Sequence, residues 1–157
     1  MLNASFPRVA AAWLLAALST VQAAPRKVET FDAQAWQRLQ ADTRQPAAVV
    51  FTTTDCAHCP AVIEQLAAHI RRHRPTAELI AVVMDAAPGD ADATLLSDSH
   101  YRPADRLFAF AGQAAALRFG VNPAWRGVTP YVGLLKPQGA PVWVTGRPSA
   151  ADLAAWP

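Results

Sequence analysis

The sequence predicts a single α/β domain in which helices cover both faces of a central mixed β-sheet. Three observations support this prediction. Helical and strand patterns alternate from residue 30 onward, two strand segments are apolar throughout, and the last two strand segments are joined by a short turn. An apolar fraction of 52% in 157 residues supplies one hydrophobic core of ordinary size and not two.

The first predicted elements are a helix over residues 32–44 and a strand over residues 47–53. Thr30 or Asp32 can cap the helix, and Pro46 ends it. The strand lacks polar alternation, which is typical of a strand buried on both faces of a sheet. It leads directly into the cysteine motif described below.

In the middle of the chain, the sequence pattern predicts a helix over residues 60–73, ended by Pro75. It also predicts a second apolar strand over residues 78–84. The apolar residues of this helix recur at the spacing of one buried stripe and are Val62, Ile63, Leu66, Ala67 and Ile70. Residues 85–98, rich in Asp and Ala, predict a loop with a short helix.

The last third of the chain predicts a strand, a helix, a β-hairpin and a final helix. Their bounds, in chain order, are 107–110, 112–119 closed by Gly120, 131–135 with 141–146, and 150–156. The hairpin turn is Pro137-Gln138-Gly139, and Ser149 is the expected N-cap of the final helix.

The N-terminus has the pattern of a secretory signal peptide. Arg8 is its only charge, Val9 to Leu18 are uninterrupted apolar residues, and small residues precede a cleavage point after Ala23. We therefore expect residues 1–23 to be removed and residues 24–157 to form the exported domain. The apolar run is shorter than the roughly 20 residues of a membrane-spanning helix, so a retained anchor is the weaker alternative and no stable membrane insertion is expected after cleavage.

The charge distribution argues against nucleic acid as a partner. The formal net charge is +2, and the basic residues are spread along the chain without a block of like charge. Nothing in the sequence requires a cofactor, and a monomer is the expected state.

Both cysteines of the chain lie in one motif, Cys56-Ala57-His58-Cys59. A structural zinc site normally takes four ligands, and a disulfide that closes so short a loop removes little entropy from the unfolded chain. Redox chemistry is therefore favoured over metal binding or an inert staple. Export would place the pair where disulfides persist.

The position of the motif before a helix predicts the roles of its residues. The helix N-terminus favours a thiolate on Cys56, whereas Cys59, one turn into the helix, is the resolving thiol. A protonated His58 would stabilise the Cys56 thiolate, and the carboxylate of Asp55 would oppose it. The remaining histidines, His69, His73 and His100, are expected to be solvated rather than metal ligands.

The sequence resembles the thioredoxin superfamily over residues 30–156, since a buried strand ending in Cys-x-x-Cys is followed by Thr129-Pro130 before a hairpin and a helix. The resemblance implies a thioredoxin-like fold in which Pro130 is a cis-proline facing the cysteines. It also implies that the Thr129 backbone binds a partner polypeptide. The long separation of Cys56 from Pro130 resembles the TlpA-like periplasmic branch, with residues 107–120 as its extra strand-helix element.

That branch implies a periplasmic thiol-disulfide oxidoreductase that exchanges disulfides with exported proteins and is recycled by a membrane redox protein. The chain departs from the family pattern at three places: Asp55 replaces the usual Trp, Ala57-His58 replaces Gly-Pro, and Val50 replaces a buried Asp. The His58 position is similar to that of the DsbA-like oxidases.

Two other functions remain open from the sequence. A copper-handling protein would bind Cu(I) through Cys56 and Cys59, with His58 or His100 as an additional ligand, because soft sulfur ligands select that ion. A redox-inert adaptor with the same fold would exchange disulfides no faster than a free dithiol.

Overall fold

A six-stranded mixed sheet organises the chain. The computed structural model describes residues 24–42, 44–89 and 91–156, so the predicted signal peptide, residues 1–23, lies outside the described part. The strands are β1 Val28–Phe31, β2 Ala47–Thr52, β3 Glu78–Val83, β4 Arg106–Phe110, β5 Tyr131–Leu135 and β6 Val142–Thr145. Their spatial order is β1-β4-β3-β2-β5-β6. The first four strands in this order run parallel, and β5 and β6 are antiparallel to their neighbours.

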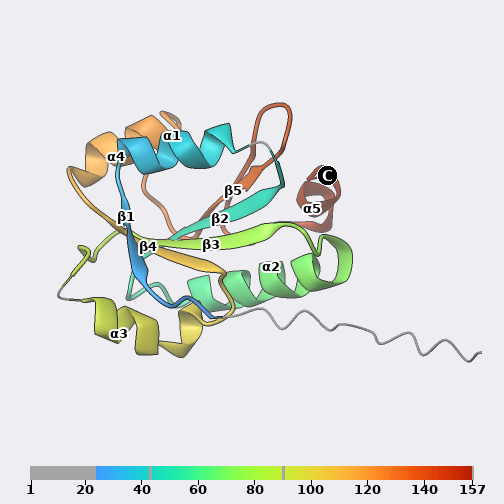
Figure 1. Cartoon of the computed structure of the whole chain (residues 1–157). Helices are drawn as coiled ribbons and strands as arrows, with labels where there is room; N and C mark the ends of the chain where they lie inside the picture. The colour runs from blue at the N-terminus through green and yellow to red at the C-terminus, as the bar shows by residue number, and fades with distance from the viewer. Residues whose placement is uncertain (1–23, 43, 90, 157) are drawn as a thin grey trace, which may run out of the picture.

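Helices cover both faces of this sheet, as the sequence predicts (Figure 1). Helices α1 and α4 lie on one face, and α2 and α3 lie on the other. The bounds are α1 Ala33–Ala41, α2 Cys59–His73, α3 Asp92–Ser97, the 3-10 helix η1 Ser99–Tyr101, α4 Ala114–Val121 and α5 Ala150–Ala154. In the described ranges, no helix has both the length and the apolarity needed to cross a bilayer.

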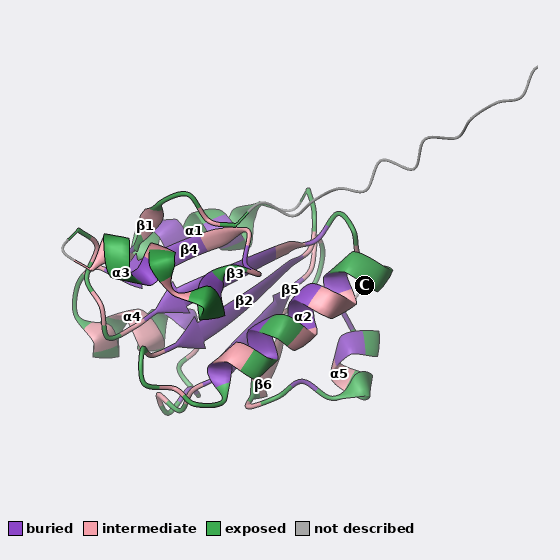
Figure 2. Ribbon diagram, turned by 90° about the horizontal axis from the view of Figure 1, so that it is seen from below, coloured by how far each residue is buried: buried purple, intermediate pink, exposed green. Residues whose placement is uncertain are grey.

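Strand β2 runs through the centre of the sheet, and all six of its residues are buried. Ala48 and Val50 pack into an aliphatic cluster with α2, whereas Val49 and Phe51 pack into an aromatic cluster with α1. Figure 2 shows this buried strand core between partly exposed helices. The uninterrupted apolar sequence of β2 therefore has the cause expected from the sequence, which is burial on both faces.

Side-chain hydrogen bonds fix the ends of the short helices. The Asp32 carboxylate accepts from the Ala35 N–H at 2.7 Å and caps α1. Ser149 and Asp152 form a reciprocal capping box at α5, which confirms the predicted cap. The buried Trp156 indole then donates to the Leu135 carbonyl at 2.8 Å, so the segment after α5 is tied to β5.

The structure differs from the expected elements at two places. Strand β1 was not expected, because its four residues, Val-Glu-Thr-Phe, give only a short pattern, and it forms an edge strand beside β4. Gly120 does not close α4, because the helix continues through it to Val121 and its φ is not positive. Asn122 is the C-cap instead.

Gly133 is required by a close contact across the hairpin. A Cβ at this position would lie 2.6 Å from Cζ3 of Trp143, whose ring stacks on Tyr131 at 5.3 Å. We expect Gly133→Ala to lower the free energy of unfolding by about 1–3 kcal/mol, because the indole must move out of its stack. Urea denaturation measures this change.

Gly120→Ala is the matched control, since a Cβ there meets nothing within 4 Å and lies inside a helix. It should leave stability unchanged or raise it by up to about 1 kcal/mol. Equal destabilisation by both substitutions would contradict the steric explanation.

Candidate redox site

The two cysteines lie where the chain leaves β2 and enters α2. Their sulfurs form a disulfide with a Cα–Cα distance of 5.5 Å. Cys59 is the first residue of α2 and is 2% exposed, whereas Cys56 precedes the helix and is half-buried. Only the Cys56 side is therefore open to a partner.

The loop that carries Cys56 is anchored to the end of β3. Asp85 accepts hydrogen bonds from the Thr54 N–H at 3.0 Å and from the Thr54 hydroxyl at 2.6 Å. The Met84 N–H donates to the Thr52 carbonyl at 2.9 Å, which continues the contact between the two strands past their ends. These bonds fix the approach of the chain to the cysteines.

A buried tyrosine lies beneath the disulfide. Tyr101, 4% exposed, lines a small cavity together with Thr52, Cys56 and Cys59. Burial, reinforced by the carboxylate of Asp98, raises the pKa of the Tyr101 phenol to about 12. The phenol is therefore a neutral hydroxyl at physiological pH. Val50, where the resemblance led us to note the loss of a buried Asp, is an apolar residue of the aliphatic cluster.

The peptide bond between Thr129 and Pro130 is cis, as the resemblance implied. Pro130 is buried and Thr129 is half-buried. Because Phe51 pairs with Tyr131, the start of β5 lies beside the end of β2, at the edge where the Cys56 loop begins. Thr129 and Pro130 thus share a sheet edge with the cysteines.

An aromatic contact holds the segment before the cis bond. The Trp125 ring stacks on Tyr131 with centroids 4.5 Å apart, and its indole N–H donates to the Val128 carbonyl at 3.0 Å. Asn122 donates to the Tyr131 hydroxyl at 2.7 Å. These contacts with the aromatic cluster therefore fix the position of the segment that leads into Thr129.

The four histidines occupy different environments, and His73 and His100 are exposed as expected. His58 is exposed, caps no backbone group of α2 and lines neither of the two cavities at Cys56. His100, in η1, lines both of them. His69 and His73 contact each other with ring centroids 4.9 Å apart on α2, and burial lowers the pKa of His69. Among the residues that the structure describes, no three His, Cys, Asp or Glu side chains gather closely enough to hold a metal.

A shallow groove of about 530 Å³ runs past Cys56. Asp55 and Glu64 provide its charged groups, and the rest of its lining consists of Thr54, Ala57, Pro60, Ala61 and His100. Its shape is that of a surface depression, which suits contact with a polypeptide better than enclosure of a small molecule.

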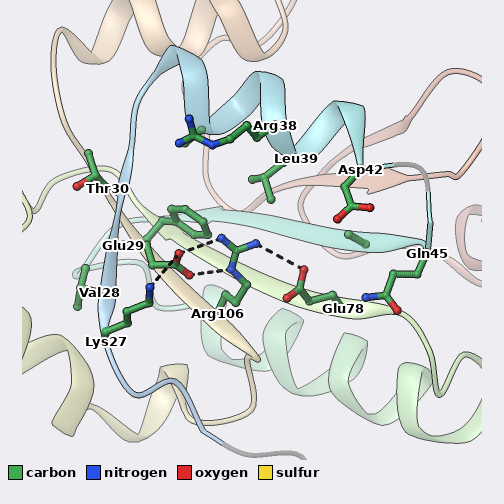
Figure 3. Close-up of a pocket in the computed structure, with 13 residues that line it drawn as sticks. Lys27, Val28, Glu29, Thr30, Arg38, Leu39, Asp42, Gln45, Glu78 and Arg106 are labelled. Carbon is green, nitrogen blue, oxygen red and sulfur yellow. Dashed lines mark hydrogen bonds and ion pairs between the residues drawn. The ribbon is translucent and has the colours of Figure 1, made fainter.

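A second large cavity, of about 520 Å³, lies at the opposite end of the sheet (Figure 3). Its lining includes the first residues of β2, β3 and β4, whereas Cys56 follows the last residue of β2. Arg106 fills its centre and forms paired hydrogen bonds to Glu29 at 2.7 and 3.0 Å and an ion pair with Glu78 at 3.8 Å. Lys27 forms a further ion pair with Glu29 at 3.6 Å, so two cations balance the two carboxylates, and the cavity lining contains no redox group.

Comparison with known proteins identifies the fold. No family model matches the chain, and no curated sequence matches it significantly. The thioredoxin domain of a thiol-disulfide oxidoreductase from Bacteroides vulgatus is similar, with 12% identity, a TM-score of 0.52, and coverage of 85% of this chain and 92% of that domain. The reduced N-terminal domain of PilB from Neisseria meningitidis has 17% identity, a TM-score of 0.52, and coverage of 82% and 88%. The chain has the thioredoxin-like fold predicted from its sequence.

The environment of the two tyrosines of the chain predicts their titration. Burial raises the pKa of both Tyr101 and Tyr131, that of Tyr101 to about 12. The Tyr101 contribution to stability is thus complete below the unfolded pKa of about 10 and is lost as the pH rises through about 12. We expect little phenolate absorbance from folded protein at about pH 10 and half-ionised tyrosine in urea-unfolded protein. Equal phenolate absorbance in the two states would contradict the burial of these hydroxyls.

Proposed function

We propose that the protein is an exported thiol-disulfide oxidoreductase that exchanges disulfides with partner proteins through Cys56 and Cys59. The observation that carries the proposal is the disulfide between the half-buried Cys56 and the buried Cys59 at the start of α2. The thioredoxin-like fold supports it, since one structure with this fold is a domain of a thiol-disulfide oxidoreductase.

In the reduced enzyme, the Cys56 thiolate attacks one sulfur of a partner disulfide and releases the other as a thiolate, which takes up the proton that Cys56 lost. Cys59 then attacks Cys56 and releases the second partner thiol, so two electrons pass to the partner and the Cys56–Cys59 disulfide forms. The same steps run in reverse when the enzyme oxidises a partner. The positive end of the α2 dipole favours the Cys56 thiolate, and an exposed His58 adds positive charge when protonated.

We assign recognition of the partner backbone to Thr129 and Pro130. In the described part of the chain, no group hydrogen-bonds to the Thr129 main chain, whereas the Pro130 carbonyl accepts from the Gly146 N–H at 2.8 Å. The free main-chain groups of Thr129 lie at the sheet edge beside the cysteine loop. An extended partner segment can therefore pair with them while its cysteine reaches Cys56.

The remaining parts of the proposal concern cellular context. Residues 1–23 direct export to the periplasm and are removed, and residues 24–157 act there as a single-domain monomer. Its partners are exported thiols and disulfides, and a membrane redox protein restores its oxidation state. Nucleic acid and cofactors have no part in the cycle.

We do not propose the copper-handling alternative. Cys56 and Cys59 would be its sulfur ligands, and His58 and His100 its candidate nitrogen ligands. The described residues hold no three-ligand cluster, and the fold is shared with a disulfide-exchanging domain.

Cys59→Ala should trap partners. Removal of the resolving thiol leaves Cys56 in mixed disulfides, and turnover with a disulfide substrate should fall by about 100-fold or more. Non-reducing electrophoresis of extracts from the exporting cells, followed by mass spectrometry, detects the adducts. Cys56→Ala is the matched control and should trap nothing; adducts of equal abundance with both variants, or with neither, would contradict the exchange mechanism.

Export is tested separately by the N-terminus of the exported protein. We expect the purified periplasmic form to begin at Ala24, because Ala23 completes the small-residue cleavage pattern. Intact-mass measurement identifies the first residue. A full-length chain recovered from the membrane fraction would contradict cleavage and support the anchored alternative.

A further inference from the structure

His100, rather than the histidine inside the motif, lines the cavities at Cys56. It lines both the small cavity beneath the disulfide and the groove past Cys56. Helix η1 packs against α2, and Figure 1 places the segment after α3 beside the beginning of α2. The imidazole is 56% exposed, so it is open to the groove rather than buried in the core.

Asp98 controls the orientation of this imidazole. Its Oδ1 accepts from the His100 backbone N–H at 2.9 Å and lies 3.3 Å from Nδ1 of the ring. With Nδ1 directed toward the carboxylate, Nε2 is the nitrogen left for another partner. A nucleophile, a base and a group that orients the base form the arrangement by which weak nucleophiles are activated in enzymes.

The acidic surroundings of the groove oppose ionisation of the Cys56 thiol, which a base would promote. Asp55 and Glu64 are the acidic groups on its rim, Asp85 binds the adjacent Thr54, and Asp98 lies beside His100. Carboxylates near a thiol disfavour its ionisation. The neutral Tyr101 hydroxyl beneath the disulfide supplies no compensating positive charge.

We propose that His100 is the proton acceptor for Cys56, with Asp98 as its positioning residue. The inference rests on the proposed function and names a further residue of the same site. The Cys56 S–H proton passes to Nε2 of His100, and the resulting thiolate forms a bond to one sulfur of the partner disulfide. The partner S–S bond breaks, its electron pair leaves on the second sulfur, and that sulfur takes the proton from the imidazolium. Electrons and protons balance within the thiol and disulfide pair.

The test measures Cys56 alkylation by iodoacetamide in the reduced protein between about pH 5 and pH 9, with peptide mass spectrometry to separate Cys56 from Cys59. His100→Gln should slow alkylation by about tenfold at about pH 6, and the two rates should converge near about pH 9, where thiols ionise without assistance. Asp98→Asn should give a smaller loss, because the ring remains but its orientation relaxes. His73→Gln, the same substitution at an exposed site at the far end of α2, should match wild type.

The pH profile distinguishes this role from a structural one, because a misfolded loop would change the rate at every pH. Identical profiles for His100→Gln and wild type would overturn the proposal, as would a loss that persists unchanged at high pH. Alkylation requires no partner, so such results count against His100 alone. Wild-type protein that exchanges no disulfide with oxidised glutathione would instead contradict the proposed function, and the role of His100 with it.

Discussion

The burial of β2 on both faces is the constraint on which the site depends. Aliphatic side chains hold it from the α2 side and aromatic side chains hold it from the α1 side. Its parallel pairing with β3 brings Asp85 to the end of β2, and its antiparallel pairing with β5 brings Pro130 to the same edge. The loop to Cys56 begins at that edge, so a central strand that cannot shift in register sets the position of the reactive sulfur relative to its neighbours.

Much of this arrangement could be predicted from the sequence because its causes are local. An apolar run without alternation indicates a strand covered on both faces, and two cysteines separated by two residues before a helical stripe indicate a redox pair. The cis bond before Pro130 followed from the family resemblance rather than from any local pattern. The hairpin and the Ser149 cap depend on turn and cap chemistry that extends over only a few residues.

The features that the sequence analysis did not predict depend on contacts between segments that are distant in the chain. Tyr101 and His100 lie more than forty positions after Cys56, and they reach it only because η1 packs against α2. The segment from residue 85 to η1 is rich in Asp and Ala, and it has no periodicity from which this contact could be predicted. Strand β1 was not predicted for a related reason, since four residues form a strand at this edge only when β4 is present to pair with them.

The ion pair between Glu29 of β1 and Arg106 of β4 has a consequence for solubility. Open strand edges are templates for aggregation, and β1 is an edge strand of this sheet. Strand β1 is short, Lys27 precedes it, and Glu29 within it is tied to Arg106 by two hydrogen bonds. An unfolded chain that approached this edge would find few residues to pair with and two charges to desolvate. The short length and the ion pairs of β1 therefore disfavour edge-to-edge pairing with another chain.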